Sequence, residues 1–192
     1  MSASPLILAS ASPRRKALLQ MIGVTPDEII PADIDETELP RETAATYVAR
    51  VARGKAEKIA AERKDAFVLA ADTCVAVGRR ILPKAEDEQT ARDCLALLSG
   101  RSHRVFSGVA LISPDGALRE RVVETRVKVV RLTDQVIEEY IASKEWDGKA
   151  GGYAIQGLFA RHVISIIGSH PNVIGLPLYE TANLLDGAGW WK

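Results

Sequence analysis

The chain alternates between short apolar runs and longer segments in which apolar residues recur every three or four positions. Short runs of this kind are typical of buried strands, and the longer spacing is typical of amphipathic helices. Leu6–Ala9 and Phe67–Ala71 are expected to be buried strands. Between them, the pattern predicts a helix over Pro13–Ile22 and a longer helix over Thr43–Glu62. Because strands and helices follow one another in this order, the sequence predicts an α/β or mixed α+β fold.

The second half of the chain predicts a helix, a long hairpin and several short elements. Asp87–Leu98 has helical spacing, and its acidic start suits the positive end of a helix dipole. Arg104–Ile112 and Leu118–Leu132 are expected to pair as antiparallel strands, because the residues between them include the Pro and Gly of a tight turn. The remaining expected elements are a helix from Thr133 or Asp134 to about Ser143, a glycine-rich segment over Gly148–Gly157, a strand over His162–Ile167 and a short helix over Leu178–Leu185.

Composition and charge narrow the class of protein. A chain of 192 residues has the length of one domain, and its 25 Lys and Arg balance 25 Asp and Glu. Without a net positive charge, the chain is not expected to bind nucleic acid or a membrane through a broad basic surface. Its longest apolar run, Ala66–Ala71, is far shorter than the ~20 residues that span a bilayer. Two cysteines, Cys74 and Cys94, make no disulfide framework, which favours a reducing cytoplasm.

A polar turn between the first strand and the first helix suits a bound anion. Ser12 is a good N-cap, and Pro13 fits the first helical position. Arg14 and Arg15 then fall in the first turn, where each cation is disfavoured by ~0.3–1 kcal/mol unless a negative group lies nearby. Together with the hydroxyls of Ser10 and Ser12, these groups predict a phosphate site that needs no glycine-rich loop. The alternative is a pair of solvated arginines beside an ordinary helix cap.

Acidic residues follow two of the expected strands. Asp72 comes directly after Phe67–Ala71, so we expect it at the carboxyl edge of the sheet, where open α/β sheets bind ligands. The Thr73 hydroxyl lies next to it, and the alternative role for Asp72 is that of a plain turn residue. A group of four carboxylates follows a short strand expected at Glu28–Ile30. This group either forms a solvated loop or supplies a ligand to a hard metal ion. Its members are Asp33, Asp35, Glu36 and Glu38.

Three more polar residues are candidates for binding a ligand, but their spacing alone does not decide between this role and a structural one. Lys55 lies on the long helix, Lys84 lies in a loop, and Gln156 lies in the glycine-rich segment. Lysines are mostly surface groups, and a glycine-rich bend can lead into a strand as readily as it approaches a ligand. Cys74 has no histidine partner in a nucleophile pattern, and the three histidines are too scattered to indicate a zinc site.

Five motifs, taken together and in this order, resemble the Maf family of nucleoside triphosphate pyrophosphatases. They run through nearly the whole chain and are Leu6–Arg15, Ala70–Thr73, Leu97–His103, Lys149–Gly157 and Gly175–Leu178. The resemblance implies a central mixed sheet flanked by helices, folded as one domain over residues 1–192 with two lobes around a cleft. It also implies hydrolysis of a nucleoside triphosphate to the monophosphate and pyrophosphate with a divalent cation. Members are commonly dimeric, so a homodimer is expected.

The resemblance also assigns roles by position. Asp72 matches the proton acceptor of the family, and Arg14, Thr73 and Gln156 match its three specificity positions. A divalent cation, Mg²⁺ or Mn²⁺, is expected at Glu36 with Asp72 nearby, because such ions bind through one or two carboxylates and phosphates. The polar pocket residues that the resemblance implies are Ser10, Glu36, Lys55 and Lys84, and the polar turn adds Ser12 and Arg15.

The residue after the proton acceptor indicates a branch of the family. Asp72-Thr73 resembles the branch that acts on dTTP and UTP, whereas the branch that acts on 7-methyl-GTP typically carries glutamine after the aspartate. The function implied is therefore removal of surplus or unwanted pyrimidine nucleotides, with a possible link to arrest of cell division. Two alternatives stay open. One is a pyrophosphatase for 7-methyl-GTP or another modified nucleotide, and the other is a nucleotide-sensing regulator of septum formation.

The chain departs from the usual family pattern in three places. Ala85 follows Lys84 where the family usually has proline, and Gly148 stands where aspartate commonly precedes the lysine of the glycine-rich motif. His170-Pro171 replaces a more usual aromatic segment. None of the three removes a residue to which the resemblance assigns chemistry.

Overall fold

The computed structural model describes residues 4–191, in which helices and strands follow one another along the chain. The strands are β1 (Leu6–Leu8), β2 (Glu28–Ile29), β3 (Phe67–Val77), β4 (Arg80–Leu82), β5 (Lys84–Ala85), β6 (Ser102–Ile112), β7 (Leu118–Val129), β8 (Lys149–Ala150) and β9 (Val163–Ile167). The helices are α1 (Pro13–Met21), α2 (Ala44–Glu62), α3 (Glu88–Leu98), α4 (Asp134–Ala142), the 3₁₀ helix η1 (Leu158–His162), α5 (His170–Ile174) and α6 (Leu178–Gly187).

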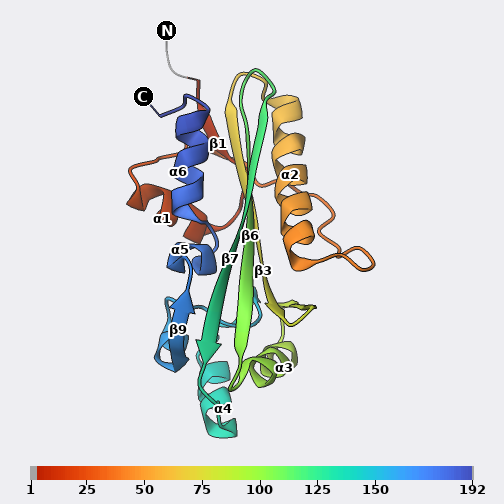
Figure 1. The fold of residues 1–192 in the computed structure, drawn as a ribbon, viewed down its shortest axis with the longest axis vertical. Coiled ribbons are helices and arrows are strands. Elements are labelled where there is room, and N and C mark those ends of the chain that lie inside the picture. The colour runs from red at the N-terminus through yellow and green to blue at the C-terminus, as the bar shows by residue number, and fades with distance from the viewer. Residues whose placement is uncertain (1–3, 192) are drawn as a thin grey trace.

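A long twisted sheet runs the length of the molecule (Figure 1). Its strand order is β2-β1-β3-β6-β7-β9, and β4 pairs with the end of β3. Because β1 is parallel to both β2 and β3 while the other pairs are antiparallel, the sheet is mixed. A mixed sheet flanked by helices confirms the expected fold class. A separate two-stranded sheet joins β5 to β8.

Three helices begin where the sequence predicts, because a polar side chain caps each. Thr43, Asp87 and Thr133 accept hydrogen bonds from the backbone N–H three residues further along. The start of α1 differs from the expectation. Ser12 occupies the N-cap position and Pro13 follows it, but the Ser12 side chain makes no capping bond.

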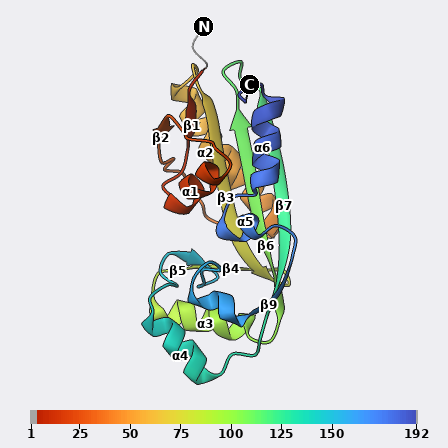
Figure 2. The ribbon, with the colours of Figure 1, turned by 90° about the vertical axis from the view of Figure 1, so that its left-hand side faces the viewer.

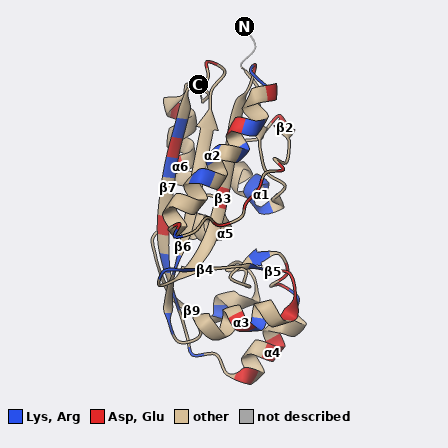
Figure 3. Ribbon diagram, turned by 90° about the vertical axis from the view of Figure 1, so that its right-hand side faces the viewer, with Lys and Arg blue, Asp and Glu red and all other residues tan. Residues whose placement is uncertain are grey.

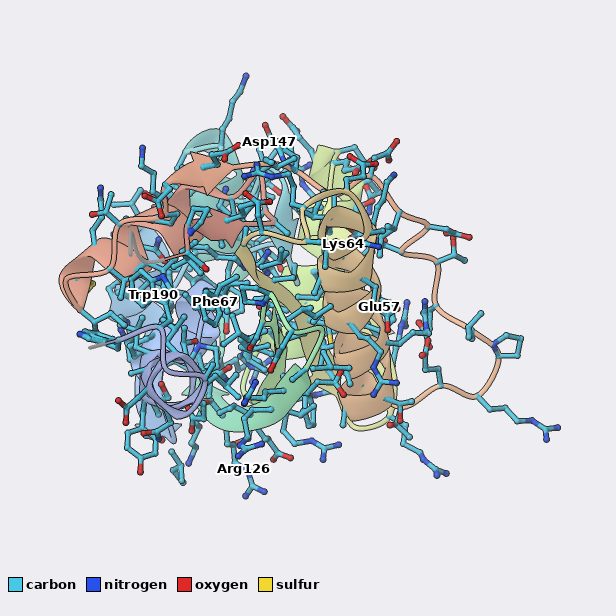
Figure 4. All side chains as sticks on the ribbon, turned by 90° about the horizontal axis from the view of Figure 1, so that it is seen from above. Glu57, Lys64, Phe67, Arg126, Asp147 and Trp190 are labelled. Atoms are coloured by element: carbon cyan, nitrogen blue, oxygen red, sulfur yellow. The ribbon has the colours of Figure 1, made fainter. Side chains whose placement is uncertain are left out.

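Helices cover both faces of the sheet and bury separate hydrophobic clusters. Helix α2 packs on one face through small residues such as Ala52 and Ala56, and it comes close to β6 at Gly108, where a Cβ atom would meet the Val48 carbonyl. Helices α1 and α6 pack on the opposite face. Seen from above, Glu57 of α2 and Trp190 after α6 lie on opposite sides (Figure 4). No helix in residues 4–191 has the length and apolar character needed to cross a membrane.

Strand β3 is longer than the sequence predicts, and this corrects the expected place of Asp72. The strand does not end at Ala71 but continues to Val77, and it is paired with β6 as far as Ala76. Asp72 therefore lies in the middle of a strand, 4% exposed, and not at the carboxyl edge. It is β1 that ends, since Leu8 lies opposite Leu69 and marks its last residue. Beyond that point β3 has no β1 neighbour, and space opens beside Asp72.

Figure 2 shows how the sheet joins two parts of the molecule. The upper part contains β1, β2, α1, α2 and α6, and the lower part contains β5, α3 and α4. Strands β3, β6 and β7 extend from the upper part into the lower part. The lower part has its own hydrophobic cluster, in which residues of α3 and α4 pack on Val75, Val105 and Val127 of the sheet.

Candidate functional site

A cavity of about 510 Å³ lies beside β3, at the point where β1 ends. Segments far apart in the sequence line it: the turn before α1, the loop before α2, the middle of β3, and two segments near residues 147–156 and 173–175. The structure brings together the residues that the family resemblance and the polar turn assign to the site. The cavity is lined by Ser10, Ser12, Arg14, Arg15, Glu36, Lys55, Asp72, Thr73, Lys84 and Gln156.

Lys55 lies between two carboxylates at the inner end of the cavity. Its Nζ is 2.9 Å from Asp72 Oδ1 and 2.8 Å from Glu36 Oε1. Glu36 Oε2 accepts a further hydrogen bond, at 3.1 Å, from Lys84 Nζ on β5. Burial opposes ionisation of Glu36, but the hydrogen bonds and positive charges of Lys55 and Lys84 outweigh it, so the pKa of Glu36 lies below its ordinary value. Glu36 is therefore a stable carboxylate at neutral pH.

Glu36 and Asp72 offer the oxygen ligands that Mg²⁺ and Mn²⁺ prefer. Among residues 4–191 no group of three His, Cys, Asp or Glu is arranged to hold a metal ion by itself. Lys55 holds the two carboxylates close to each other. A pair of carboxylates suits a cation that takes its other ligands from water and phosphate, as Mg²⁺ usually does. The donor set thus suits a metal that arrives with a phosphorylated ligand.

The other acidic residues of the same loop lie outside this cavity. Asp33 and Asp35 are exposed, and Asp35 Oδ1 accepts a hydrogen bond from the Thr37 N–H in a local turn. For these two residues the solvated-loop interpretation holds. Glu38 lines a neighbouring cavity of about 420 Å³.

The two arginines of α1 have different surroundings. Arg15 donates from Nε to the Gly175 carbonyl at 2.9 Å, from Nη1 to Ser10 Oγ at 3.1 Å and from Nη2 to Thr73 Oγ1 at 3.3 Å. Burial lowers the pKa of Arg15, and the negative charge of Asp72 opposes this effect. No hydrogen bond or ion pair joins the Arg14 guanidinium to another residue within 4–191. Arg14 is thus available to an external anion.

Backbone at the start of α1 adds to this anion-binding character. The Ser12 N–H donates to Ser10 Oγ at 3.2 Å, so one hydroxyl orients the turn and also accepts from Arg15. The first N–H groups of a helix carry partial positive charge, and no side chain caps them here. Positive side chains and helix-end N–H groups therefore share one wall of the cavity.

The glycine-rich segment forms the opposite wall and is anchored by buried aromatic residues. The His103 Nε2 and Tyr153 OH atoms are 2.7 Å apart, and the Ala154 N–H donates to Tyr140 OH at 3.0 Å. Gly151 has a positive φ of 67° and lies against Val75, where a Cβ atom would be 2.9 Å from the valine side chain. Beyond these anchors the segment presents Gln156, which is exposed at the cavity.

Two parts of the wall were not singled out from the sequence. Lys149 of β8 lines the cavity, and burial, followed by the nearby charge of Arg14, lowers its pKa. Lys149 is the first residue of the motif Lys149–Gly157, and this position is the sequence signal that could have identified it. Helix α5 brings Val173, Ile174 and Gly175 to the cavity. The pattern Ser169-His170-Pro171 is a helix-start signal, because a serine cap and an early proline favour helix initiation.

Burial of His103 predicts a pH-dependent stability. Burial lowers the pKa of His103 to about 4, whereas an unfolded histidine titrates near ~6.5. The folded-state pKa is depressed, so this contribution to stability is complete above pH ~6.5 and is lost as the pH falls toward ~4. Urea unfolding of the wild type should show a loss of roughly 2 kcal/mol from this group between pH 7.5 and pH 5.

A matched pair of variants isolates this effect. His103→Gln keeps a hydrogen-bonding side chain at this position but has no imidazole to take up a proton. The free energy of unfolding of this variant should therefore fall less between pH 7.5 and pH 5 than that of the wild type. His170→Gln, at an exposed position, should keep the wild-type slope. A His103→Gln slope equal to that of the wild type would show that His103 does not set the dependence.

Basic and acidic residues are interspersed along the helices and strands, in line with the balanced composition (Figure 3). The cavity differs from this even distribution because cations prevail in it. It is lined by five cationic residues, Arg14, Arg15, Lys55, Lys84 and Lys149, and three carboxylates, Glu36, Asp72 and Asp147. Such a pocket favours a small polyanion.

Comparison with known proteins adds to this geometry. The family model described as "Maf-like protein" matches residues 5–188. A dTTP/UTP pyrophosphatase of Mesorhizobium japonicum is 58% identical over 191 residues, covering 96% of this chain and 92% of its own length. A dTTP/UTP pyrophosphatase of Caulobacter vibrioides is 57% identical and covers 99% of both chains.

Solved structures show the same fold at much lower identity. A HAM1 protein from Coxiella burnetii has a TM-score of 0.52 and 16% identity, covering 95% of this chain and 98% of its own. The Ham1 protein of Staphylococcus aureus has a TM-score of 0.51 and 14% identity with the same coverage. At such identities the likeness concerns the fold alone.

Proposed function

The chain belongs to the Maf family, and from this membership and the charges of the cavity we propose that it hydrolyses dTTP and UTP to the nucleoside monophosphate and pyrophosphate. The observation that carries the proposal is the arrangement of Glu36, Lys55 and Asp72 in a cationic cavity. A volume of about 510 Å³ is within the usual range for small-molecule sites, about 300–1,000 Å³. The surplus of cations suits a triphosphate.

Asp72 is the proposed general base. Its Oδ1 accepts from Lys55, which holds the carboxylate in place, and no residue within 4–191 hydrogen-bonds its Oδ2. Oδ2 can take the proton of a water molecule that attacks the α-phosphorus. A new P–O bond then forms to that water, and the bond to the leaving pyrophosphate breaks. General-base assistance of this type contributes ~10²–10⁴-fold.

Positive groups stabilise the charge that develops on the phosphates. The Arg14 guanidinium has no hydrogen-bond or ion-pair partner within residues 4–191, and we propose that it binds the triphosphate directly, with Arg15, Lys84 and the start of α1. Glu36 and Asp72 would hold a divalent cation, Mg²⁺ or Mn²⁺, which supplies charge neutralisation on the phosphate oxygens. Lys55 separates the two carboxylates and keeps them from repelling each other.

Base recognition is assigned to the wall that carries Gln156. Uracil and thymine share an imide edge with one N–H between two carbonyls, and an amide side chain can donate and accept along that edge. Gln156 is exposed at the cavity on an anchored segment, so it can meet a base without moving the backbone.

We further propose that residues 1–192 form one domain with two lobes and act as a cytoplasmic house-cleaning enzyme. Strands β3, β6 and β7 run through both parts of the molecule, which supports one domain (Figure 2). The use of two buried, unpaired cysteines supports a reducing compartment. A homodimer is proposed from the family resemblance, and sedimentation velocity would test it.

Turnover of a nucleotide panel tests the proposed function. With Mg²⁺, dTTP and UTP should each give one pyrophosphate per monophosphate, and a chelator should abolish the reaction. Preferential hydrolysis of 7-methyl-GTP would assign the chain to the other branch of the family. Tight dTTP binding without any hydrolysis would support the sensor alternative and overturn the proposal.

A further inference from the structure

A row of hydroxyl side chains crosses one face of the sheet between two hydrophobic clusters. Thr73 on β3 lies opposite Ser107 on β6, and Thr125 on β7 lies two pairs further along, opposite Val105. Ser107 and Thr125 are fully buried. On β6, Val109 lies two residues after Ser107 and belongs to the cluster under α1 and α6, whereas Val105 lies two residues before Ser107 and belongs to the cluster around α3. The row thus forms a polar seam where the two clusters meet.

Helix α5 supplies the hydrogen bonds that this seam needs. Thr125 Oγ1 donates to the Ser169 carbonyl at 3.2 Å and accepts from the Ser169 N–H at 3.0 Å. Asn172 Nδ2 donates to Thr125 Oγ1 at 3.0 Å and to the Val105 carbonyl at 3.2 Å, and Ser107 Oγ donates to the Asn172 carbonyl at 3.2 Å. Because these groups hold α5 to both β6 and β7, its position on the sheet is fixed.

The other end of α5 sets the geometry of Arg15. Gly175 follows the helix, and its carbonyl accepts from Arg15 Nε at 2.9 Å and from Thr73 Oγ1 at 3.2 Å. Of the five N–H donors of Arg15, three bond to protein acceptors, which leaves one on each terminal nitrogen for a ligand. Since the Gly175 carbonyl is one of these acceptors, the placement of α5 determines where the two remaining donors point.

Thr73 has the same kind of role. Its Oγ1 accepts from Arg15 Nη2 and lies 2.8 Å from Ser107 Oγ and 3.2 Å from the Gly175 carbonyl. Because Ser107 uses its own hydrogen toward the Asn172 carbonyl, both of these contacts compete for the single hydrogen of Thr73. In either arrangement the Thr73 hydrogen is used inside the protein, and its oxygen holds Arg15.

We propose that Asn172, Thr125 and Ser107 are positioning residues that orient Arg15 toward the triphosphate. This inference rests on the proposed function, because it takes Arg15 as a triphosphate ligand. None of the three residues lines the cavity, so they act through α5 and Gly175. Asn172 Oδ1 is buried without a hydrogen-bond partner among the described residues, a cost of about 1–3 kcal/mol that packing alone does not require.

Two substitutions at Thr125 test the proposal. Thr125→Val keeps the shape of the side chain and removes the hydroxyl that joins Asn172 and Ser169. Its KM for dTTP should rise about tenfold while kcat stays within about threefold, as for loss of ground-state binding. Thr125→Ser keeps the hydroxyl and should keep the wild-type KM. A Thr125→Val enzyme that melts at a lower temperature but has an unchanged KM would overturn the proposal.

The effect should also depend on Arg15. In an Arg15→Lys background the forked guanidinium is absent, so Thr125→Val should raise KM no further. Fully additive changes would show that the seam does not act through Arg15. Should Thr125→Val fail to fold, Ser107→Ala removes a single donor and is judged by the same change in KM. Absence of dTTP turnover in the wild type would overturn the proposed function. The Kd for dTTP would then replace KM in these comparisons.

Discussion

An Asp72→Asn variant should bind dTTP with nearly wild-type affinity and turn it over ~10²- to 10⁴-fold more slowly. Asparagine has the same shape, and its oxygen can still accept from Lys55, as Asp72 Oδ1 does at 2.9 Å. The amide cannot take a proton from water, however. Steady-state pyrophosphate release gives kcat, and calorimetry in the presence of Mg²⁺ gives Kd. Asp35→Asn, a carboxylate outside the cavity, is the matched control and should retain wild-type kcat.

Metal dependence separates two roles of Asp72 in this experiment. If the carboxylate served only as a metal ligand, raising the Mg²⁺ concentration would restore kcat in Asp72→Asn. Loss of a general base is not restored in this way, so we expect kcat to stay low at saturating Mg²⁺. Glu36→Gln, in contrast, should recover part of its activity with added Mg²⁺. A normal kcat in Asp72→Asn would remove this residue from the role of base.

The wild-type enzyme should discriminate strongly against CTP. Cytosine presents an amino donor and a ring acceptor where uracil presents a carbonyl and an N–H. A site built for the imide edge leaves polar groups unpaired with cytosine, and such mismatches lower kcat/KM by ~10⁴-fold. We therefore expect kcat/KM for dTTP and UTP to exceed that for CTP by this factor, measured by pyrophosphate release. Equal values for UTP and CTP would contradict the assigned recognition.

Variants of Gln156 show whether this residue carries the selectivity. Gln156→Leu removes both the donor and the acceptor, so the ratio of UTP to CTP should fall, mainly through loss of UTP turnover. Gln156→Glu keeps the shape and an acceptor but loses the N–H donors. Gln20→Leu, on the exposed side of α1, should leave the ratio unchanged. An unchanged ratio in Gln156→Leu would place base recognition elsewhere in the cavity.

Local sequence signals predicted most elements of the fold, because each signal has its own physical cause. Polar caps set the starts of α2, α3 and α4, and the turn at Ser113–Gly116 set the hairpin between β6 and β7. Near the end of β7, buried residues alternate with exposed ones, as expected of a strand with one covered face. These features depend on neighbours in the sequence, so no knowledge of distant contacts was needed to find them.

Elements that depend on distant partners were harder to predict. Strand β3 was expected to end at Ala71, because Asp72 and Thr73 interrupt its apolar run. The strand continues because Lys55 and Arg15, from two different helices, satisfy those polar side chains. Helix α5 has a local start signal in its serine cap and early proline, but it is only five residues long, and its buried Asn172 depends on hydrogen bonds to β6 and β7 that the sequence does not show.

The candidate site was predicted by resemblance more than by spacing. Residue types alone did not distinguish Glu36 from Asp33 and Asp35 in the same loop. Glu36 differs because Lys55 and Lys84, which are 29 residues apart in the chain, both reach it. That convergence follows from the tertiary fold and has no local signature.

The cluster under α1 and α6 joins the two ends of the polypeptide. Leu6, Leu18 and Leu19 pack there with Leu176 and Leu185, and Arg15 bonds Gly175 across 160 positions. During synthesis on the ribosome, the early leucines therefore emerge long before Leu176 and Leu185. The surface that α6 covers stays exposed until these residues have left the exit tunnel, and exposed apolar surface of this kind favours aggregation. Nascent chains of this protein should accordingly engage holdase chaperones, and the nucleotide pocket should assemble only after residues 173–175 have emerged.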